Sequence, residues 1–102
     1  MKVRWSRAAV EDLREAEAFI AADSPLYAQR FAARVLASTR KLAAHPRVGR
    51  EVPEGDDPNI RELIVQAYRV IYRVAGDLVN VLGVVHGAGD LGAAPAKPWE
   101  NA

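Results

Sequence analysis

The chain has 102 residues, which is enough for one domain of ordinary size and excludes a second catalytic domain. It contains no cysteine, so disulfides, a thiolate nucleophile and cysteine-based zinc sites are excluded. Its 14 Lys and Arg residues nearly balance 13 Asp and Glu residues, and the net charge of +1 argues against direct nucleic-acid binding.

Nothing in the sequence suggests export or membrane insertion. The N-terminus has no apolar signal core, and apolar runs such as residues 81–85 are far shorter than a membrane span. We therefore expect a cytoplasmic protein with no membrane partner.

The first half of the chain is expected to form a short strand followed by two helices. Residues 3–5 alternate in polarity, and Ser6 stands where its hydroxyl can cap a helix over about 7–22. A serine–proline pair then begins a second helix, which apolar residues at intervals of three and four predict over 25–44.

The second half of the chain is expected to form a sheet. Residues 45–59 hold three prolines, two glycines and no periodicity, which predicts an irregular surface connection. Runs rich in Val, Ile, Tyr and Leu then predict an antiparallel meander over 60–65, 68–74 and 78–86. Residues 87–102 predict a loose tail or a docked extended segment. The order β-α-α-β-β-β gives an α+β fold, in which a helix hairpin packs on one face of a small, mainly antiparallel sheet.

A group of arginines on or near the predicted strands is a candidate binding site: Arg50, Arg61, Arg69 and Arg73. Because the strands are neighbours, the guanidinium groups are predicted to converge, and such a cluster holds a phosphate or a partner's carboxylate. The alternative is a solvated sheet face on which the arginines pair across strands with Glu62 and Asp77.

A second basic group lies on the second predicted helix. Arg30, Arg34 and Lys41 fall within about 40° of one another around the helix axis, away from its apolar stripe. This basic ridge is either an ordinary solvated helix face or a surface that binds a partner.

The histidines and tyrosines offer fewer possibilities. His86 closes the last predicted strand and could act as an acid or base, since imidazole titrates near neutral pH; the alternative is a hydrogen-bonded structural histidine. His45 is expected to stabilise the end of the second helix. The histidines lack metal-ligand spacing, so no metal site and no cofactor are predicted. Tyr68 and Tyr72 share a strand face and are expected to serve the core.

Several short motifs occur in an order typical of one protein family. The most specific is Tyr-Arg-Val-Ile-Tyr-Arg-Val at 68–74, which precedes the Val-His-Gly strand end at 85–87. The other motifs are Trp5-Ser6, Asp12-Leu13, Ala44-His45-Pro46, Gly49-Arg50, Arg61-Glu62-Leu63 and Asp90-Leu91. Over about residues 3–91 the chain resembles the ParE/RelE superfamily of bacterial type II toxins, and more closely its ParE-like branch.

This resemblance implies a toxin domain over 1–91 and a C-terminal tail at 92–102. It implies the toxin of a toxin–antitoxin pair, which inhibits DNA gyrase without chemistry of its own and is neutralised by a cognate antitoxin. The candidates for toxicity and target binding are then Arg50, Arg61, Arg69, Arg73, His86 and Asp90. The candidates for antitoxin binding are Arg30, Arg34 and Lys41.

Two other functions stay open. RelE-like members are ribosome-dependent mRNA endoribonucleases, for which Arg61, Arg73 and His86 would be the catalytic candidates. The low net charge, and Gly87 where such members often have tyrosine, disfavour that activity. ParE-like proteins usually carry a basic residue where this chain has Ala88-Gly89, so an attenuated toxin that mainly binds its antitoxin is the third possibility.

Overall fold

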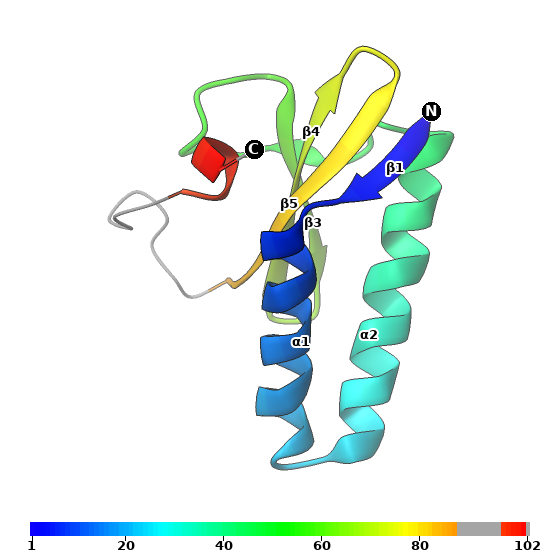
Figure 1. The fold of residues 1–102 in the computed structure, drawn as a ribbon, viewed down its shortest axis with the longest axis vertical. Coiled ribbons are helices and arrows are strands. Elements are labelled where there is room, and N and C mark those ends of the chain that lie inside the picture. The colour runs from blue at the N-terminus through cyan, green and yellow to red at the C-terminus, as the bar shows by residue number, and fades with distance from the viewer. Residues whose placement is uncertain (88–96, 102) are drawn as a thin grey trace.

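The computed structural model describes residues 1–87 and 97–101, and its elements follow the predicted order (Figure 1). One strand and two helices come first: β1 (Lys2–Trp5), α1 (Arg7–Ala21) and α2 (Pro25–Arg40), with the 3-10 turn η1 (Lys41–Ala43) directly after α2. Four strands and a C-terminal 3-10 turn follow: β2 (Arg50–Glu51), β3 (Ile60–Val65), β4 (Tyr68–Ala75), β5 (Leu78–His86) and η2 (Pro98–Asn101).

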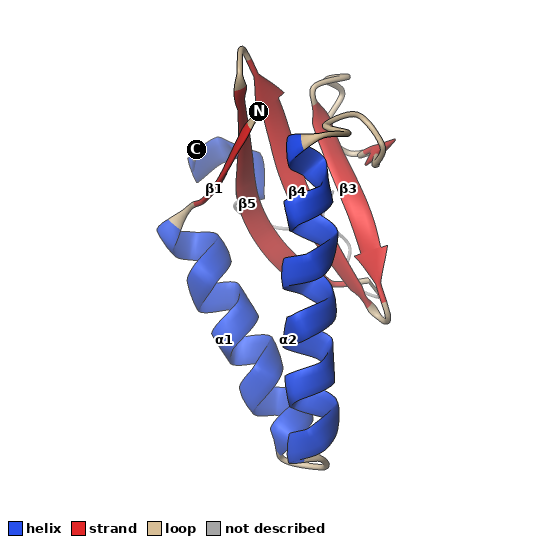
Figure 2. Ribbon diagram, turned by 90° about the vertical axis from the view of Figure 1, so that its right-hand side faces the viewer, coloured by secondary structure: helices blue, strands red, loops and turns tan. Residues whose placement is uncertain are grey.

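The strands form one sheet in the order β1-β5-β4-β3-β2. β1 runs parallel to β5, whereas all other neighbours are antiparallel. The register between β4 and β5 shifts between Ile71 and Tyr72, which leaves Leu82 as the extra residue of a bulge. Both helices lie on the same face of this sheet (Figure 2), so the predicted α+β architecture is confirmed.

Both helices begin where the sequence predicts. The hydroxyls of Ser6 and Ser24 accept hydrogen bonds from the backbone N–H three residues on, at 3.1 and 3.2 Å respectively. Each bond satisfies an N–H group that the first helical turn leaves without a partner. The second helix ends at Arg40, earlier than predicted, because the chain tightens there into η1.

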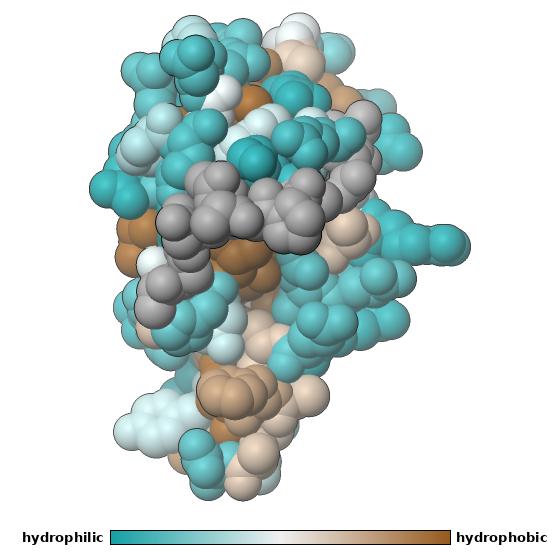
Figure 3. Space-filling model, turned by 90° about the vertical axis from the view of Figure 1, so that its left-hand side faces the viewer, coloured by the Kyte–Doolittle hydropathy of each residue, from teal (hydrophilic) through white to brown (hydrophobic). Residues whose placement is uncertain are grey.

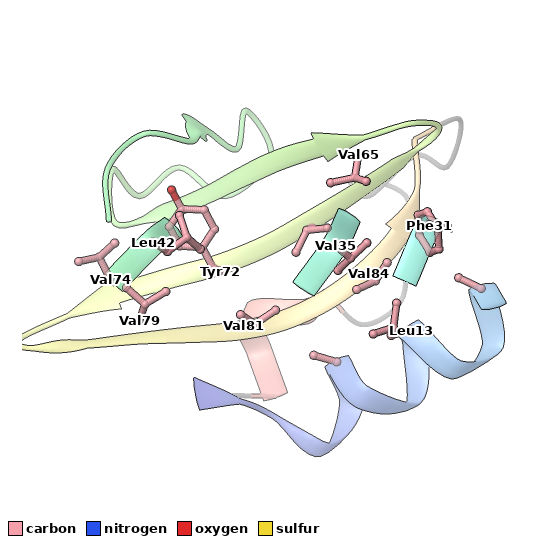
Figure 4. Close-up of a cluster of buried hydrophobic side chains, with 13 residues drawn as sticks. Leu13, Phe31, Val35, Leu42, Val65, Tyr72, Val74, Val79, Val81 and Val84 are labelled. Atoms are coloured by element: carbon pink, nitrogen blue, oxygen red, sulfur yellow. The ribbon is translucent and has the colours of Figure 1, made fainter. Parts of the chain in front are cut away.

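The main core lies between the helix hairpin and the sheet (Figure 4). Leu13 of α1 and Phe31 of α2 meet side chains of the three central strands there. Tyr72 is fully buried, and Tyr68 packs against the same cluster with its ring centroid 4.9 Å from that of Phe31. The prediction that both tyrosines serve the core is therefore confirmed.

The outer face of the sheet, opposite the helices, is partly covered as well. A second apolar cluster lies there, formed by Val52, Ile60 and Ile71 with Val85 and Trp99 packed against it. Val52 belongs to the connection after η1 and is only 2% exposed. The prediction of an irregular surface connection is thus wrong in part, because this segment forms β2 and folds back over the sheet.

The hairpin tip extends past the end of the sheet (Figures 1 and 2). Phe19, Leu26 and Tyr27, near this tip, are 72%, 55% and 61% exposed because no strand lies beneath them. Figure 3 shows apolar side chains gathered at the lower end of one face of the molecule. None of the described helices is long and apolar enough to cross a membrane.

Candidate functional site

The strand register divides the four candidate arginines between two faces of the sheet. Directly opposed residues share a face, so Arg61, the partner of Tyr72, lies on the face that carries the helices. Arg50, Arg69 and Arg73 have partners on the outer face. The predicted convergence is therefore wrong for Arg61, because register and alternation send its side chain to the other side of the sheet.

On the outer face, two arginines share one buried carboxylate. The side chain of Glu62 has no exposed surface and accepts hydrogen bonds from Nε of Arg50 and Nε of Arg69, each at 2.5 Å. The far end of the Arg69 guanidinium donates to both oxygens of Glu54 at 2.8 and 3.0 Å. These bonds tie β2 and the loop after it to β3 and β4. They also satisfy Glu62, because a carboxylate is buried at low cost only when it is paired and hydrogen-bonded.

This pairing also determines which cations a ligand could use. Hydrogen bonds from Arg69 lower the pKa of Glu54 from 4.5 to about 2, and the Glu54 carboxylate in turn raises the pKa of Arg69. All three nitrogens of Arg69 donate to carboxylates, so its charge is neutralised within the chain. For Glu62, the cross-strand pairing that the sequence left as an alternative is what the structure shows; the ion pairs of the described residues do not include Asp77.

Arg73 lies under the C-terminal turn η2. Its guanidinium donates to the carbonyl oxygen of Trp99 at 3.2 Å, and the Trp99 ring packs on the second apolar cluster. A Cβ at Gly83 would stand 3.1 Å from Cβ of Pro98, so glycine lets η2 approach β5 closely. The described part of the predicted tail is thus docked on the sheet, as a 3-10 turn and not in an extended form.

Arg61 supports the loop that follows η1. Its guanidinium donates to the carbonyl oxygens of Gly49 at 2.9 Å and Arg47 at 3.3 Å, while its buried Nε has no hydrogen-bond partner among the described residues. The Tyr72 hydroxyl accepts a hydrogen bond from Gly49 N at 2.9 Å, and burial raises the pKa of this tyrosine. A Cβ at Gly49 would lie 2.5 Å from that hydroxyl oxygen, so only glycine fits.

His86 lies at the end of β5, where several hollows meet. It pairs in register with Tyr68, and the two rings form an edge-to-face contact with centroids 5.2 Å apart. Hollows of about 500, 330 and 320 Å³ border on both residues, the largest on the side of Arg50 and another on the side of Phe19. His86 is exposed, so a partner that fills these hollows would contact it.

Asp12 has a structural role that sequence reasoning missed. Its Oδ2 accepts a hydrogen bond from Val84 N at 3.0 Å, on the part of β5 that β1 leaves uncovered, and burial raises the pKa of the Asp12 carboxyl. The available signal was its spacing: Asp12 follows Ala9 by three residues and precedes Ala16 by four, which places it on the buried side of α1.

The remaining candidates are the basic ridge on α2 and η1, Asp90 and any metal-binding cluster. Arg30, Arg34 and Lys41 are exposed on α2 and η1 and make no ion pair with any described residue. Asp90 lies outside the described residues. Among residues 1–87 and 97–101, no three His, Asp or Glu side chains gather in a way that could hold a metal ion.

Comparison with known proteins covers almost the whole chain. The family model described as "ParE toxin of type II toxin-antitoxin system, parDE" matches residues 3–91. This chain belongs to the ParE toxin family. A relative from Sinorhizobium fredii (strain NBRC 101917 / NGR234), named "Putative toxin Y4kP", is 34% identical over 87 residues, which cover 83% of this chain and 86% of that protein. A solved structure described as "Chromosomal ParDE TA system from P. aeruginosa" matches with a TM-score of 0.67 at 21% identity, over 84% of this chain and 95% of that one.

The resemblance to ParE-like toxins that the motifs indicate is thereby confirmed. At 21% identity the structural likeness concerns the fold alone, and it agrees with the helix hairpin on a mixed sheet. The ParE match includes every candidate residue named from the sequence and ends before η2. Trp99, which covers Arg73, therefore lies outside the range that the ParE model matches.

Proposed function

We propose that this ParE-family toxin inhibits DNA gyrase by docking to it, without chemistry of its own, and that a cognate antitoxin neutralises it. Membership of the family supports a toxin that belongs to a toxin–antitoxin system. One observation favours docking without chemistry: the polar groups that a ribonuclease would have to bring together lie apart.

An RNA-cleaving site needs a cation that holds the phosphate within reach of an acid or base. Arg73 lies on the outer face under Trp99, whereas His86 lies on the face that carries the helices. Arg61 shares that face, but the β4 partners of Arg61 and His86 are Tyr72 and Tyr68, about 13 Å apart along the strand at the usual rise per residue. The three catalytic candidates of the RelE-like alternative therefore do not form one site, which favours docking.

The surface that we propose for gyrase surrounds His86 and Arg50. Both residues line the 500 Å³ hollow together with Tyr68 and Ile64, and Ile64 is 56% exposed. Aromatic and aliphatic side chains with a polar rim suit a protein partner. We propose Asp90 and Arg73 as secondary contacts of the same partner.

Arg61 and Arg69 have a different proposed role. Both are engaged inside the chain, Arg61 with loop carbonyls and Arg69 with two carboxylates. We therefore expect each to affect toxicity only indirectly, by holding the loop after η1 and the loop after β2 in place. Conservative substitution of either should lower stability and toxicity together.

An antitoxin partner is supported by the structural relative, whose description names a ParDE toxin–antitoxin system. We propose that the antitoxin contacts the basic ridge of Arg30, Arg34 and Lys41, which no described carboxylate of the chain neutralises. A gyrase target places the toxin in the cytoplasm.

A supercoiling assay with purified gyrase tests the proposal. We expect the toxin to inhibit supercoiling, and His86→Ala to weaken inhibition about tenfold, the usual effect of removing a central contact of an interface. His45→Ala is the matched control, because His45 is also exposed but lines none of the three hollows that border on His86.

Other outcomes would replace the proposal. Absence of inhibition by a toxin preparation that arrests growth would contradict gyrase as the target, and primer extension that finds cut messages would favour the ribonuclease. Normal growth on induction, with toxicity restored by Gly89→Arg, would favour an attenuated toxin.

A further inference from the structure

The two helices of the hairpin carry charge of opposite sign. From Ser24 to Arg50 the chain has six Lys and Arg residues and no Asp or Glu. The acidic residues Glu11, Asp12, Glu15 and Glu17 outnumber Arg7 and Arg14 on α1. The net charge of +1 therefore averages two different surfaces, and the prediction against nucleic-acid binding depended on that average.

The cations of α2 form a straight and exposed line. Arg30, Arg34 and Lys41 lie on one side of the helix and its 3-10 extension, and a rise of 1.5 Å per residue spreads them over about 16 Å. Arg40, the last residue of α2, and Arg47, in the loop after η1, extend the positive region beyond the ridge.

This arrangement has no structural use within the described part of the chain. Arg30, Arg34 and Lys41 form no ion pair there, whereas Arg50 and Arg69 of the sheet are paired with carboxylates. Arg30 and Arg34 are also four residues apart on one helix, and like charges at that spacing repel each other. A surface whose like charges repel one another in the free protein is typical of a site that binds an anionic partner.

The ridge has the features that phosphates need, whether or not an antitoxin also covers it. Protein partners are anchored by aromatic or aliphatic side chains in pockets, and none of the ridge residues lines the three hollows that border on His86. Between the cations lie the small residues Ala33 and Ala37, which allow close approach but offer no anchor. Phosphates need only exposed cations in a row.

We propose that α2 binds the phosphate backbone of double-stranded DNA through Arg30, Arg34 and Lys41. This inference rests on the proposed function, since gyrase works on DNA and a toxin docked to it would lie beside the duplex. The contact would be independent of base sequence, because contacts to phosphates carry no sequence information directly. An antitoxin that covers the ridge would then also displace the DNA.

Fluorescence anisotropy of a short labelled DNA duplex, with the full toxin at several salt concentrations, tests this contact. The triple variant Arg30→Ala/Arg34→Ala/Lys41→Ala should bind the duplex more weakly, and the slope of log affinity against log salt should fall by about 3, or about one per lost phosphate contact. The matched control Arg4→Ala/Arg7→Ala/Arg14→Ala removes three exposed cations elsewhere and should keep the slope. The thermal midpoint of the ridge variant should not fall, so lost binding is distinguishable from unfolding.

Three results would overturn the inference. These are a toxin with no affinity for the duplex at low salt, equal losses in the ridge and control variants, and a ridge variant that loses affinity for poly-glutamate but not for DNA. The last result would assign the ridge to an acidic protein. Failure of the gyrase proposal is a separate observation, because the supercoiling assay can be negative while the isolated toxin still shows the ridge-dependent DNA affinity.

Discussion

The two helices of the hairpin pack against the same sheet, but their polar side chains lie in different surroundings. On α1, the carboxylate of Asp12 turns inward and holds the backbone of β5, and the hydroxyl of Ser6 just before the helix reaches Leu82 of the same strand. On α2, the charged residues are basic, exposed and without ion pairs in the described structure. The comparison teaches that α1 turns one of its carboxylates inward to complete the fold, whereas every charged residue of α2 stays exposed.

The difference follows from where each helix lies. α1 runs beside the part of β5 that β1 does not cover, so backbone groups there need side-chain partners. α2 packs over the middle of the sheet, where neighbouring strands already pair the backbone. Its buried side can therefore be wholly apolar apart from Thr39, and its outer side carries no structural requirement.

The largest expected effect is the contrast between the one phenylalanine of α2 and the one phenylalanine of α1. Phe31→Ala should lower the free energy of unfolding by about 3–5 kcal/mol, because the Phe31 ring is 0% exposed and its removal leaves a cavity in the core. Phe19→Ala, in α1, should change it by less than about 0.5 kcal/mol, since that ring is 72% exposed. Urea unfolding of both variants measures the contrast, and equal losses would show that the hairpin tip is packed in solution.

A smaller effect is expected at Asp12. Asp12→Ala should destabilise by about 1–3 kcal/mol, because Val84 N–H would lose its acceptor. Asp12→Asn keeps an acceptor oxygen and should cost clearly less, while Glu15→Ala, an exposed acid on the same helix, should be nearly neutral. Chemical denaturation compares the three, and an Asp12→Ala variant as stable as Glu15→Ala would remove the structural role given to α1.

The smallest expected effect is a difference in pH dependence between a buried carboxyl of α1 and a paired one of the sheet. The pKa of Glu54 is lowered to about 2, so its contribution to stability is present above about pH 4.5 and is lost as pH falls toward 2. The pKa of Asp12 is raised, so its charged form costs stability and that cost disappears on acidification. Between pH 5 and about 2, the midpoint of thermal unfolding should therefore fall less steeply with pH for Glu54→Gln than for the unmodified protein, and more steeply for Asp12→Asn. The same slope of midpoint against pH in both variants would contradict these assignments.

Much of the fold could be predicted because it depends on local signals. Serine caps, apolar spacing and β-branched runs place the two helices and the three central strands close to their observed bounds. The short strand β2 and the turn η2 could not be predicted, since neither has a periodic pattern and both exist only because apolar side chains dock on the outer face of the sheet. Trp99, for example, has its role only through contact with β4 and β5, far from it in sequence.

The candidate site shows the same division. Alternation along the predicted middle strand correctly puts Arg69 and Arg73 on one face, but the face of Arg61 requires the register, which places it opposite Tyr72. The sequence offered Glu62 as a cross-strand partner of the arginines, but Glu54 was out of reach, because it meets Arg69 only through the fold-back of the loop after β2.

The sequence by itself determined the family, the order of the elements and the amphipathic faces of the helices, since these depend on residue types at short spacing. Only the tertiary structure decided which charged side chains form ion pairs within the chain and which remain available for a partner. The physical reason is that an arginine is neutralised or left available according to the carboxylate that packs beside it, and that neighbour is set by strand register and loop docking. Arg69 and Arg34 are the same residue type with opposite fates on these grounds.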